Sequence, residues 1–169
     1  ARGQGSLGYS VPASMGAAMA RPDSRVVTVS GDGGFSYAIG ELATQAQHGM
    51  KTLHVVLNNG AWGWLKMWQH LHYEGLRYSV DLESHSVSPD YAAAASALGC
   101  KGIRVDKPGE LSDAFDEAFA AEGPAVVEVR IDPEATPIDS YAKRLQSGKF
   151  YPRPGTVYRP REWRHSATV

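Results

Sequence analysis

The sequence predicts an α/β fold, a doubly wound and mostly parallel sheet with helices on both faces. Short runs of β-branched residues alternate with segments whose apolar residues have helical spacing. Short stretches of glycine, proline and polar residues separate them. Such alternation is typical of βαβ units that assemble a parallel sheet. The expected helices are 11–20, 36–48, 62–71, 91–98 and 110–121, and the expected strands are 26–29, 53–57, 102–105 and 125–131.

The first half of the chain begins with a helix of small residues, 11–20, which carries Pro12 in its first turn, where proline is tolerated. The run 26–29 is β-branched throughout, which is typical of a strand buried on both faces. Segment 36–48 has apolar residues at i, i+3, i+4 and i+7, which predicts a helix. The apolar run 53–57 predicts the next buried strand.

The second half repeats the pattern after a longer irregular stretch. Helix 62–71 is expected from the spacing of Leu65 and Trp68, and a polar loop follows it. Ser88 is expected to be the N-cap of helix 91–98. An amphipathic helix and an apolar strand complete the alternation.

Two side-chain oxygens lie where predicted strands end. Asp32 follows the strand 26–29, and Asn59 follows the strand 53–57. The carboxyl ends of neighbouring parallel strands meet at one edge of a sheet, where ligands of α/β proteins bind. Mg²⁺ prefers oxygen ligands, so Asp32 and Asn59 predict a metal site that could hold a diphosphate. The alternative role for Asp32 is to cap the following helix.

The glycines around Asp32 fit the same interpretation. Gly33 and Gly34 have no side chains, so their backbone N–H groups can approach phosphate oxygens closely. A helix expected to begin near Ser36 would direct its positive end toward the anion. An ordinary glycine turn is the alternative. A nicotinamide site is disfavoured, because no Gly-x-Gly-x-x-Gly follows a strand and Asp32 would repel phosphates.

The motif Gly31-Asp32-Gly33, the pair Asn58-Asn59 and the preceding segment 5–13 together resemble the signature of thiamine diphosphate enzymes. The resemblance covers roughly residues 3–131 and is strongest to the acetolactate synthase and benzaldehyde lyase group. It implies a C-terminal diphosphate-binding domain that binds thiamine diphosphate and Mg²⁺. Three elements in the same order make the resemblance far more specific than a single glycine motif.

The resemblance also assigns roles to individual residues. It implies that Mg²⁺ is bound by the side chains of Asp32 and Asn59 and by the backbone carbonyl of Ala61. Leu7 would lie under the bent cofactor, although a leucine packed in the core is the alternative. Trp64 and Leu65 are candidates for the wall of the substrate pocket. The full set expected to contact the cofactor is Ser6, Leu7, Gly31, Asp32, Gly33, Gly34, Asn59, Ala61, Trp62 and Gly63.

Composition excludes several classes of protein. The net charge of −1 gives no overall signal for binding nucleic acid or a membrane, and no apolar stretch approaches the length of a membrane span. Cys100 is the only cysteine, so neither an intrachain disulfide nor a zinc cluster is expected. No signal peptide is visible, and we therefore expect a cytoplasmic protein.

We expect a cofactor-binding domain over residues 1–133 and an irregular, basic tail with prolines and aromatic residues over 134–169. The abrupt start suggests the C-terminal piece of a longer enzyme. No catalytic residue is expected in this chain, because the resemblance places the activating glutamate on a separate pyrimidine-binding domain. Glu41 is too far along the expected helix to replace it. Activity would then need that domain, in a homodimer or homotetramer.

Several functions remain open on this site. The first is decarboxylation or ligation of 2-keto acids, as in acetolactate synthase. The second is a lyase that cleaves a 2-hydroxy ketone or a 2-hydroxyacyl-CoA thioester. The third is a non-catalytic subunit that binds the cofactor without turnover.

Overall fold

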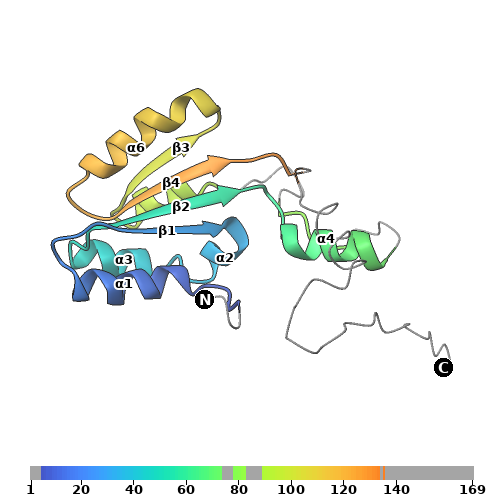
Figure 1. Ribbon diagram of the computed structural model, residues 1–169, viewed down its shortest axis with the longest axis horizontal. Helices are drawn as coiled ribbons and strands as arrows, with labels where there is room; N and C mark the ends of the chain where they lie inside the picture. Colours follow the sequence, from blue (N-terminus) through green and yellow to red (C-terminus); the bar gives the residue numbers. More distant parts are fainter. Residues whose placement is uncertain (1–4, 74–77, 83–88, 134, 136–169) are drawn as a thin grey trace, which may run out of the picture.

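The computed structural model describes residues 5–73, 78–82, 89–133 and 135. Four parallel strands form one sheet in the order β1-β2-β4-β3 (Figure 1). Helices pack on both faces, which confirms the predicted α/β class. The strands are β1 (Val26–Gly31), β2 (Thr52–Asn58), β3 (Lys101–Val105) and β4 (Ala125–Arg130). The helices are α1 (Ser10–Ala20), α2 (Asp32–Ser36), α3 (Glu41–Gln47), α4 (Gly63–His72), α5 (Tyr91–Ala97) and α6 (Leu111–Ala120), with a short 3₁₀ helix, η2 (Pro108–Glu110), before α6.

The sheet separates two apolar clusters. One cluster joins α1, α2, α3 and α5 to the sheet through Phe35, Leu42 and Val56, all fully buried. The other joins α6 to the opposite face through Ala118 and Val127. Figure 1 shows α1 and α3 on one side of the strands and α6 on the other. The layers therefore follow from the apolar stripes of these helices.

The expectation that strand β1 is buried on both faces is wrong. The exposure of β1 alternates, and the side chains of Val27 and Val29 are 47% and 64% exposed. β1 lies at the edge of the described sheet, while α6 contacts β3 and β4 at the opposite edge. A β-branched run indicates a strand but does not reveal whether a helix covers both of its faces.

The helix expected over 36–48 is not continuous: α2 begins at Asp32 and ends at Ser36, where the expected helix was to begin, and α3 begins only at Glu41. Between them, the N–H groups of Ala38 and Glu41 bond to carbonyls three residues earlier, at 3.2 and 3.1 Å. This tighter turn keeps the apolar residues on one side, so the helical spacing survives although the α-helix does not. Gly40, a poor helix former, lies within the break.

Helix α5 begins at Tyr91, as expected, but its N-cap is not the expected residue. Its N-cap is Asp90, whose side chain accepts a hydrogen bond of 2.7 Å from the N–H of Ala93. The expected cap, Ser88, lies outside the described residues. A carboxylate at this position satisfies one of the helix's unpaired N–H groups and interacts favourably with the helix dipole.

A polar network lies inside the layer between α1, α3 and the sheet. Gln45 is fully buried, and its amide nitrogen donates to Ser14 Oγ at 3.2 Å. Its carbonyl oxygen contacts Thr52 Oγ1 at 2.5 Å and His54 Nε2 at 2.9 Å. The other ring nitrogen of His54 lies 2.7 Å from Thr28 Oγ1. These bonds satisfy polar groups that would otherwise be costly to bury.

The predicted tail, 134–169, lies outside the described residues apart from Ala135, and the proposed boundary at 133 stays a prediction. Within the described ranges, no helix combines the length and apolar character needed to cross a bilayer.

Candidate functional site

The structure brings the two predicted strand ends together. Gly31 of β1 pairs in register with Leu57 of β2, so the residues that follow meet at the carboxyl edge of the sheet. The Asp32 side chain, only 3% exposed, accepts hydrogen bonds from Gly33 N–H at 2.7 Å and from Gly60 N–H at 3.0 Å. The carboxylate thus joins the first turn of α2 to the loop after β2.

Burial raises the pKa of Asp32 above its ordinary value of 3.8, while hydrogen bonds from backbone N–H groups of Gly33 and of the loop after β2 oppose the rise. Desolvation disfavours the charged form of a carboxyl group, and a nearby cation restores it. The position is therefore better suited to a carboxylate paired with a cation than to one left alone.

The loop that carries Asn59 is folded back on itself. Asn59 Oδ1 accepts from Ala61 N–H at 3.1 Å, and Asn58 Oδ1 accepts from Gly60 N–H at 2.9 Å. The second of these bonds ties Asn58 to its own loop. The carbonyl of Ala61 accepts from Gly63 N–H at 2.8 Å across an inverse γ-turn centred on Trp62, with φ −75° and ψ 68°.

Apolar side chains flank the glycines of α2. A Cβ atom on Gly34 would lie 3.9 Å from Leu7 Cδ2, and one on Gly33 would lie 3.9 Å from Trp62 Cδ2. Leu7 is 59% exposed, so it does not pack in the core, which was its alternative role. The Trp62 ring meets the Tyr37 ring edge to face at 5.9 Å. Leu7 and Trp62 thus border the α2 glycines, while Ser6 is exposed beside Leu7.

Helix α4 places Trp64 and Leu65 on its exposed surface, beyond the carboxyl ends of the strands (Figure 1). The helix expected from the spacing of Leu65 and Trp68 is present, but its buried residues are Lys66 and Met67. Trp68 instead stacks on His72, with ring centroids 4.5 Å apart. The phase of a short helix with aromatic residues on several sides is poorly defined by spacing alone.

Buried Lys66 forms an ion pair with Asp81, with 3.4 Å between Nζ and Oδ1. Asp81 belongs to a described segment, 78–82, that lies across the Asn59 loop. There, Trp62 N–H donates to Val80 O and Leu82 N–H donates to Gly60 O, both at 2.7 Å. These contacts hold α4 and the loop after β2 together.

Glu41 does not lie within a continuous helix, as the sequence suggested, but is the exposed first residue of α3. Its carboxylate accepts from Thr44 Oγ1 at 3.2 Å. The argument from helix length against a catalytic role for Glu41 therefore fails. That no catalytic residue lies in this chain stays a prediction.

Two residues near the strand ends escaped sequence reasoning. Glu128 of β4 is fully buried, and Tyr91 at the start of α5 is 5% exposed. Burial raises the pKa of Tyr91 to about 12, with further contributions from the charges of Asp32 and Glu128. The one signal for Glu128 was an acid within the apolar run Ala125–Val129.

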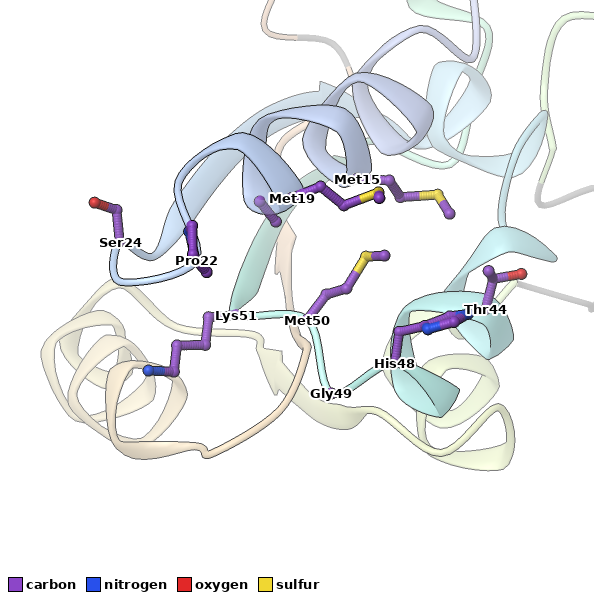
Figure 2. Close-up of a pocket in the computed structure, with 10 residues that line it drawn as sticks. Met15, Met19, Pro22, Ser24, Thr44, His48, Gly49, Met50 and Lys51 are labelled. Atoms are coloured by element: carbon purple, nitrogen blue, oxygen red, sulfur yellow. The ribbon is translucent and has the colours of Figure 1, made fainter.

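A separate cavity of about 430 Å³ lies between α1 and the turn that follows α3, near the start of β2. Figure 2 shows the side chains of Met15, Met19 and Met50 converging there. None of the predicted site residues lines it. The cavity is thus distinct from the site at the carboxyl ends of the strands.

The donor set around Asp32 fits a hard cation. In the described ranges, no group of three or more His, Cys, Asp or Glu side chains could hold a metal. One buried carboxylate, one amide and one backbone carbonyl are instead oxygen donors of the kind that Mg²⁺ takes together with phosphate. The residues present are therefore compatible with a cation that also binds a diphosphate.

Residues 1–129 match the protein family described as "Thiamine pyrophosphate enzyme, C-terminal TPP binding domain". The chain is 38% identical over 130 residues to the mitochondrial acetolactate synthase catalytic subunit of Saccharomyces cerevisiae, covering 77% of this chain and 18% of that protein. It is 39% identical over 127 residues to the acetolactate synthase of Mycobacterium avium, covering 74% of this chain and 20% of that one. The chain thus spans about a fifth of the length of these curated relatives.

Solved structures agree with this similarity. The thiamine diphosphate-dependent 4-hydroxybenzoylformate decarboxylase of Rhodococcus jostii RHA1 superposes with a TM-score of 0.67 at 32% identity, covering 75% of this chain and 23% of that one. The benzoylformate decarboxylase of Polynucleobacter necessarius gives 0.69 at 30% identity, with 79% and 25% covered. The predicted resemblance to the thiamine diphosphate enzymes is thereby confirmed.

Proposed function

The chain belongs to the thiamine pyrophosphate enzymes, as a C-terminal TPP-binding domain related to acetolactate synthase, and from this premise we propose that it binds the diphosphate of thiamine diphosphate together with Mg²⁺. The observation that carries the proposal is the Asp32 carboxylate. It is buried at the end of β1 and bonded to the loop after β2. A cation there would offset the cost of burying its charge.

Each predicted residue has a role in this proposal. Asp32, the Asn59 side chain and the Ala61 carbonyl hold Mg²⁺. The N–H groups of Gly33 and Gly34 bind the diphosphate, because the first N–H groups of an α-helix have no partner within it. The remaining cofactor contacts, at Ser6, Leu7, Gly31, Trp62 and Gly63, are proposed on the same basis.

Three of these groups already have hydrogen-bond partners in the structure, and the first is the Gly33 N–H, which donates to Asp32 Oδ1 at 2.7 Å. Asn59 Oδ1 accepts from Ala61 N–H, and Gly63 N–H donates to the Ala61 carbonyl. Asn59 must therefore turn or share its oxygen to reach the cation. The Ala61 carbonyl has a second lone pair that can accept the cation while the γ-turn persists.

In the complete protein we expect decarboxylation or ligation of 2-keto acids. Thiamine diphosphate, when bound, supplies the electron sink for breaking or forming the bond beside a keto group. The names of the relatives, synthases and decarboxylases, support this class over a 2-hydroxy ketone or 2-hydroxyacyl-CoA lyase. Trp64 and Leu65 are proposed for the substrate wall. A pyrimidine-binding domain, a homodimer or homotetramer, and a cytoplasmic location stay predictions.

The test is calorimetric titration of thiamine diphosphate with and without Mg²⁺. Asp32→Asn keeps the size of the side chain but removes its charge and presents an amide N–H₂ to N–H donors. It should bring Mg²⁺-dependent binding below detection while the fold survives. Asp116→Asn, at an exposed position on α6, is the matched control and should bind like wild type. Unchanged affinity in Asp32→Asn would refute the metal assignment.

Turnover separates an enzyme from a non-catalytic subunit. The full polypeptide that carries residues 1–169 should consume a 2-keto acid such as pyruvate. Residues 1–169 alone should bind the cofactor weakly and consume none, because the activating glutamate is expected on another domain. Pyruvate consumption by the isolated chain would contradict this expectation, and a full polypeptide that binds the cofactor without turnover would favour the binding subunit.

A further inference from the structure

A fully buried carboxylate, Glu128 of β4, lies beneath the loop that carries Asn59. Glu128 pairs in register with Val56 of β2 and faces the same side of the sheet as α5. Its Oε1 accepts from Asn58 Nδ2 at 2.6 Å, and its Oε2 accepts from the backbone N–H of Ala92 at 2.9 Å. Both oxygens are therefore used as hydrogen-bond acceptors.

Asn58 connects Glu128 to the proposed metal site through hydrogen bonds. Its amide nitrogen donates to Glu128 and, at 3.3 Å, to the carbonyl of Pro89. Its oxygen accepts from Gly60 N–H at 2.9 Å, and the same N–H donates to Asp32 Oδ2 at 3.0 Å. A continuous chain of hydrogen bonds thus runs from Glu128 through Asn58 and Gly60 to Asp32.

The chain of bonds determines which way each group faces. Both oxygens of Glu128 accept hydrogen bonds. Glu128 therefore orients the Asn58 amide with its nitrogen toward the Glu128 carboxylate and its oxygen toward the Gly60 N–H. Gly60 has φ +65°, a left-handed conformation that favours glycine, so the loop turns sharply at this point. The Gly60 N–H then points at Asp32, and the next residue along, Ala61, has its carbonyl in the proposed ligand set.

Glu128 also connects the site to α5. Ala92 is the second residue of that helix, so Glu128 satisfies one of its unpaired N–H groups while Asp90 satisfies another. An ionised carboxylate accepting two short hydrogen bonds forms strong, directional contacts. The cost of burying this group is offset by two bonds, one from Asn58 at the end of β2 and one from Ala92 of α5.

We propose that Glu128 is a positioning residue for Mg²⁺ and diphosphate binding, which acts through Asn58 to hold the loop 58–61 against Asp32. This inference rests on the proposed function of the same site. Groups that orient metal ligands without touching the metal typically contribute a factor of about 10 to 100 in metal affinity. A merely structural acid would change stability but not the Mg²⁺ requirement of the folded protein.

The experiment measures half-saturation by Mg²⁺ at fixed thiamine diphosphate, in the full polypeptide that carries residues 1–169. Glu128→Gln has one acceptor oxygen where the carboxylate has two. Its N–H₂ group must therefore face one of the two donors, Asn58 Nδ2 or the Ala92 N–H. This variant should raise the half-saturating Mg²⁺ concentration at least about tenfold. Asn58→Ala should raise the half-saturating Mg²⁺ concentration by a similar factor. The double variant should need no more Mg²⁺ than the single variant with the larger effect, because both residues act in one chain of hydrogen bonds.

Val127→Ala is the matched control. Val127 is the neighbouring buried residue of β4, but it belongs to the cluster on the opposite face, under α6. It should lower the melting temperature without changing Mg²⁺ half-saturation by more than about twofold. If Glu128→Gln does not fold, Asn58→Ala decides the matter alone against the same control.

The outcomes distinguish the two proposals. A wild-type protein that binds thiamine diphosphate without any need for Mg²⁺ would overturn the proposed metal site and this inference with it. Alternatively, the wild-type protein requires Mg²⁺ while Glu128→Gln and Asn58→Ala raise the half-saturating Mg²⁺ concentration no more than Val127→Ala does. That result would overturn the role of Glu128 and leave the proposed metal site standing. Additive losses in the double variant would show that Glu128 does not act through Asn58 and would likewise overturn the inference.

Discussion

His54 should make the stability of the fold depend on pH. It is fully buried in β2, and burial lowers the pKa of its imidazole to about 4 from an ordinary value of 6.5. The groups that contact it are Thr28, Gln45 and the Phe35 ring, none of which carries a charge. Gln45 Oε1 accepts from Nε2–H, so Nδ1 accepts from the Thr28 hydroxyl in a neutral ring.

The sign follows from this neutral folded form. The unfolded chain takes up a proton near pH 6.5, whereas the folded chain does so only near pH 4. The stabilisation is therefore complete above pH 6.5 and is lost as the pH falls toward 4. At about 1.4 kcal/mol for each pH unit, the gap corresponds to a loss of about 3 kcal/mol in the free energy of unfolding.

Urea unfolding of the chain, followed by tryptophan fluorescence at several pH values from 7.5 to 4, measures this loss. His54→Gln cannot titrate and should flatten the profile by about 3 kcal/mol relative to wild type, although it is less stable at pH 7.5. His48→Gln, at an exposed position in the turn after α3, is the control and should keep the wild-type profile. Identical profiles for wild type and His54→Gln would refute the reasoning.

Two further predictions concern surfaces. β1 pairs only with β2 in the described sheet and exposes Val27 and Val29, so the isolated chain should self-associate through this edge. Val29→Lys should weaken that association in sedimentation velocity without lowering the melting temperature, and an unchanged monomer fraction would contradict this role. Deleting residues 141–169 from the full polypeptide should reduce the proposed activity more than the melting temperature, because the sequence of this basic, aromatic segment shows no helical or strand periodicity. Full activity after deletion would show that the segment is dispensable.

The sequence was informative where chemistry depends on the position of strand ends. Asp32 and the Asn59 loop meet because parallel strands joined by a helix must end at one edge, whatever the details of packing. The pair Gly31 and Leu57 confirms this geometry. Strand order is a different matter, since it arises from contacts between distant segments. The exposure of Val29 could therefore not be predicted from its own neighbours in the chain.

Other errors came from treating periodicity as hydrogen bonding. The apolar residues of 36–48 keep one face through the break at Gly40, so their spacing does not distinguish one helix from two. Glu128 was missed because sequence patterns mark where an acid would be exposed, and a buried acid depends on partners such as Asn58 that are distant in the chain. The contacts of these residues could be identified only from the folded structure.

Gly63→Ala tests the ligand role of Asn59 without weakening the fold. A Cβ atom at Gly63 would lie 2.6 Å from Asn59 Nδ2, which is too close, so the Asn59 side chain must move. That atom ends a flexible side chain, and alanine favours the first turn of α4, so the melting temperature should change little. Gly16→Ala in α1 meets nothing within 4 Å and is the matched control. We expect Gly63→Ala to lose Mg²⁺-dependent affinity for thiamine diphosphate and Gly16→Ala to keep it. If both variants bind like wild type, Asn59 is not a ligand whose position matters.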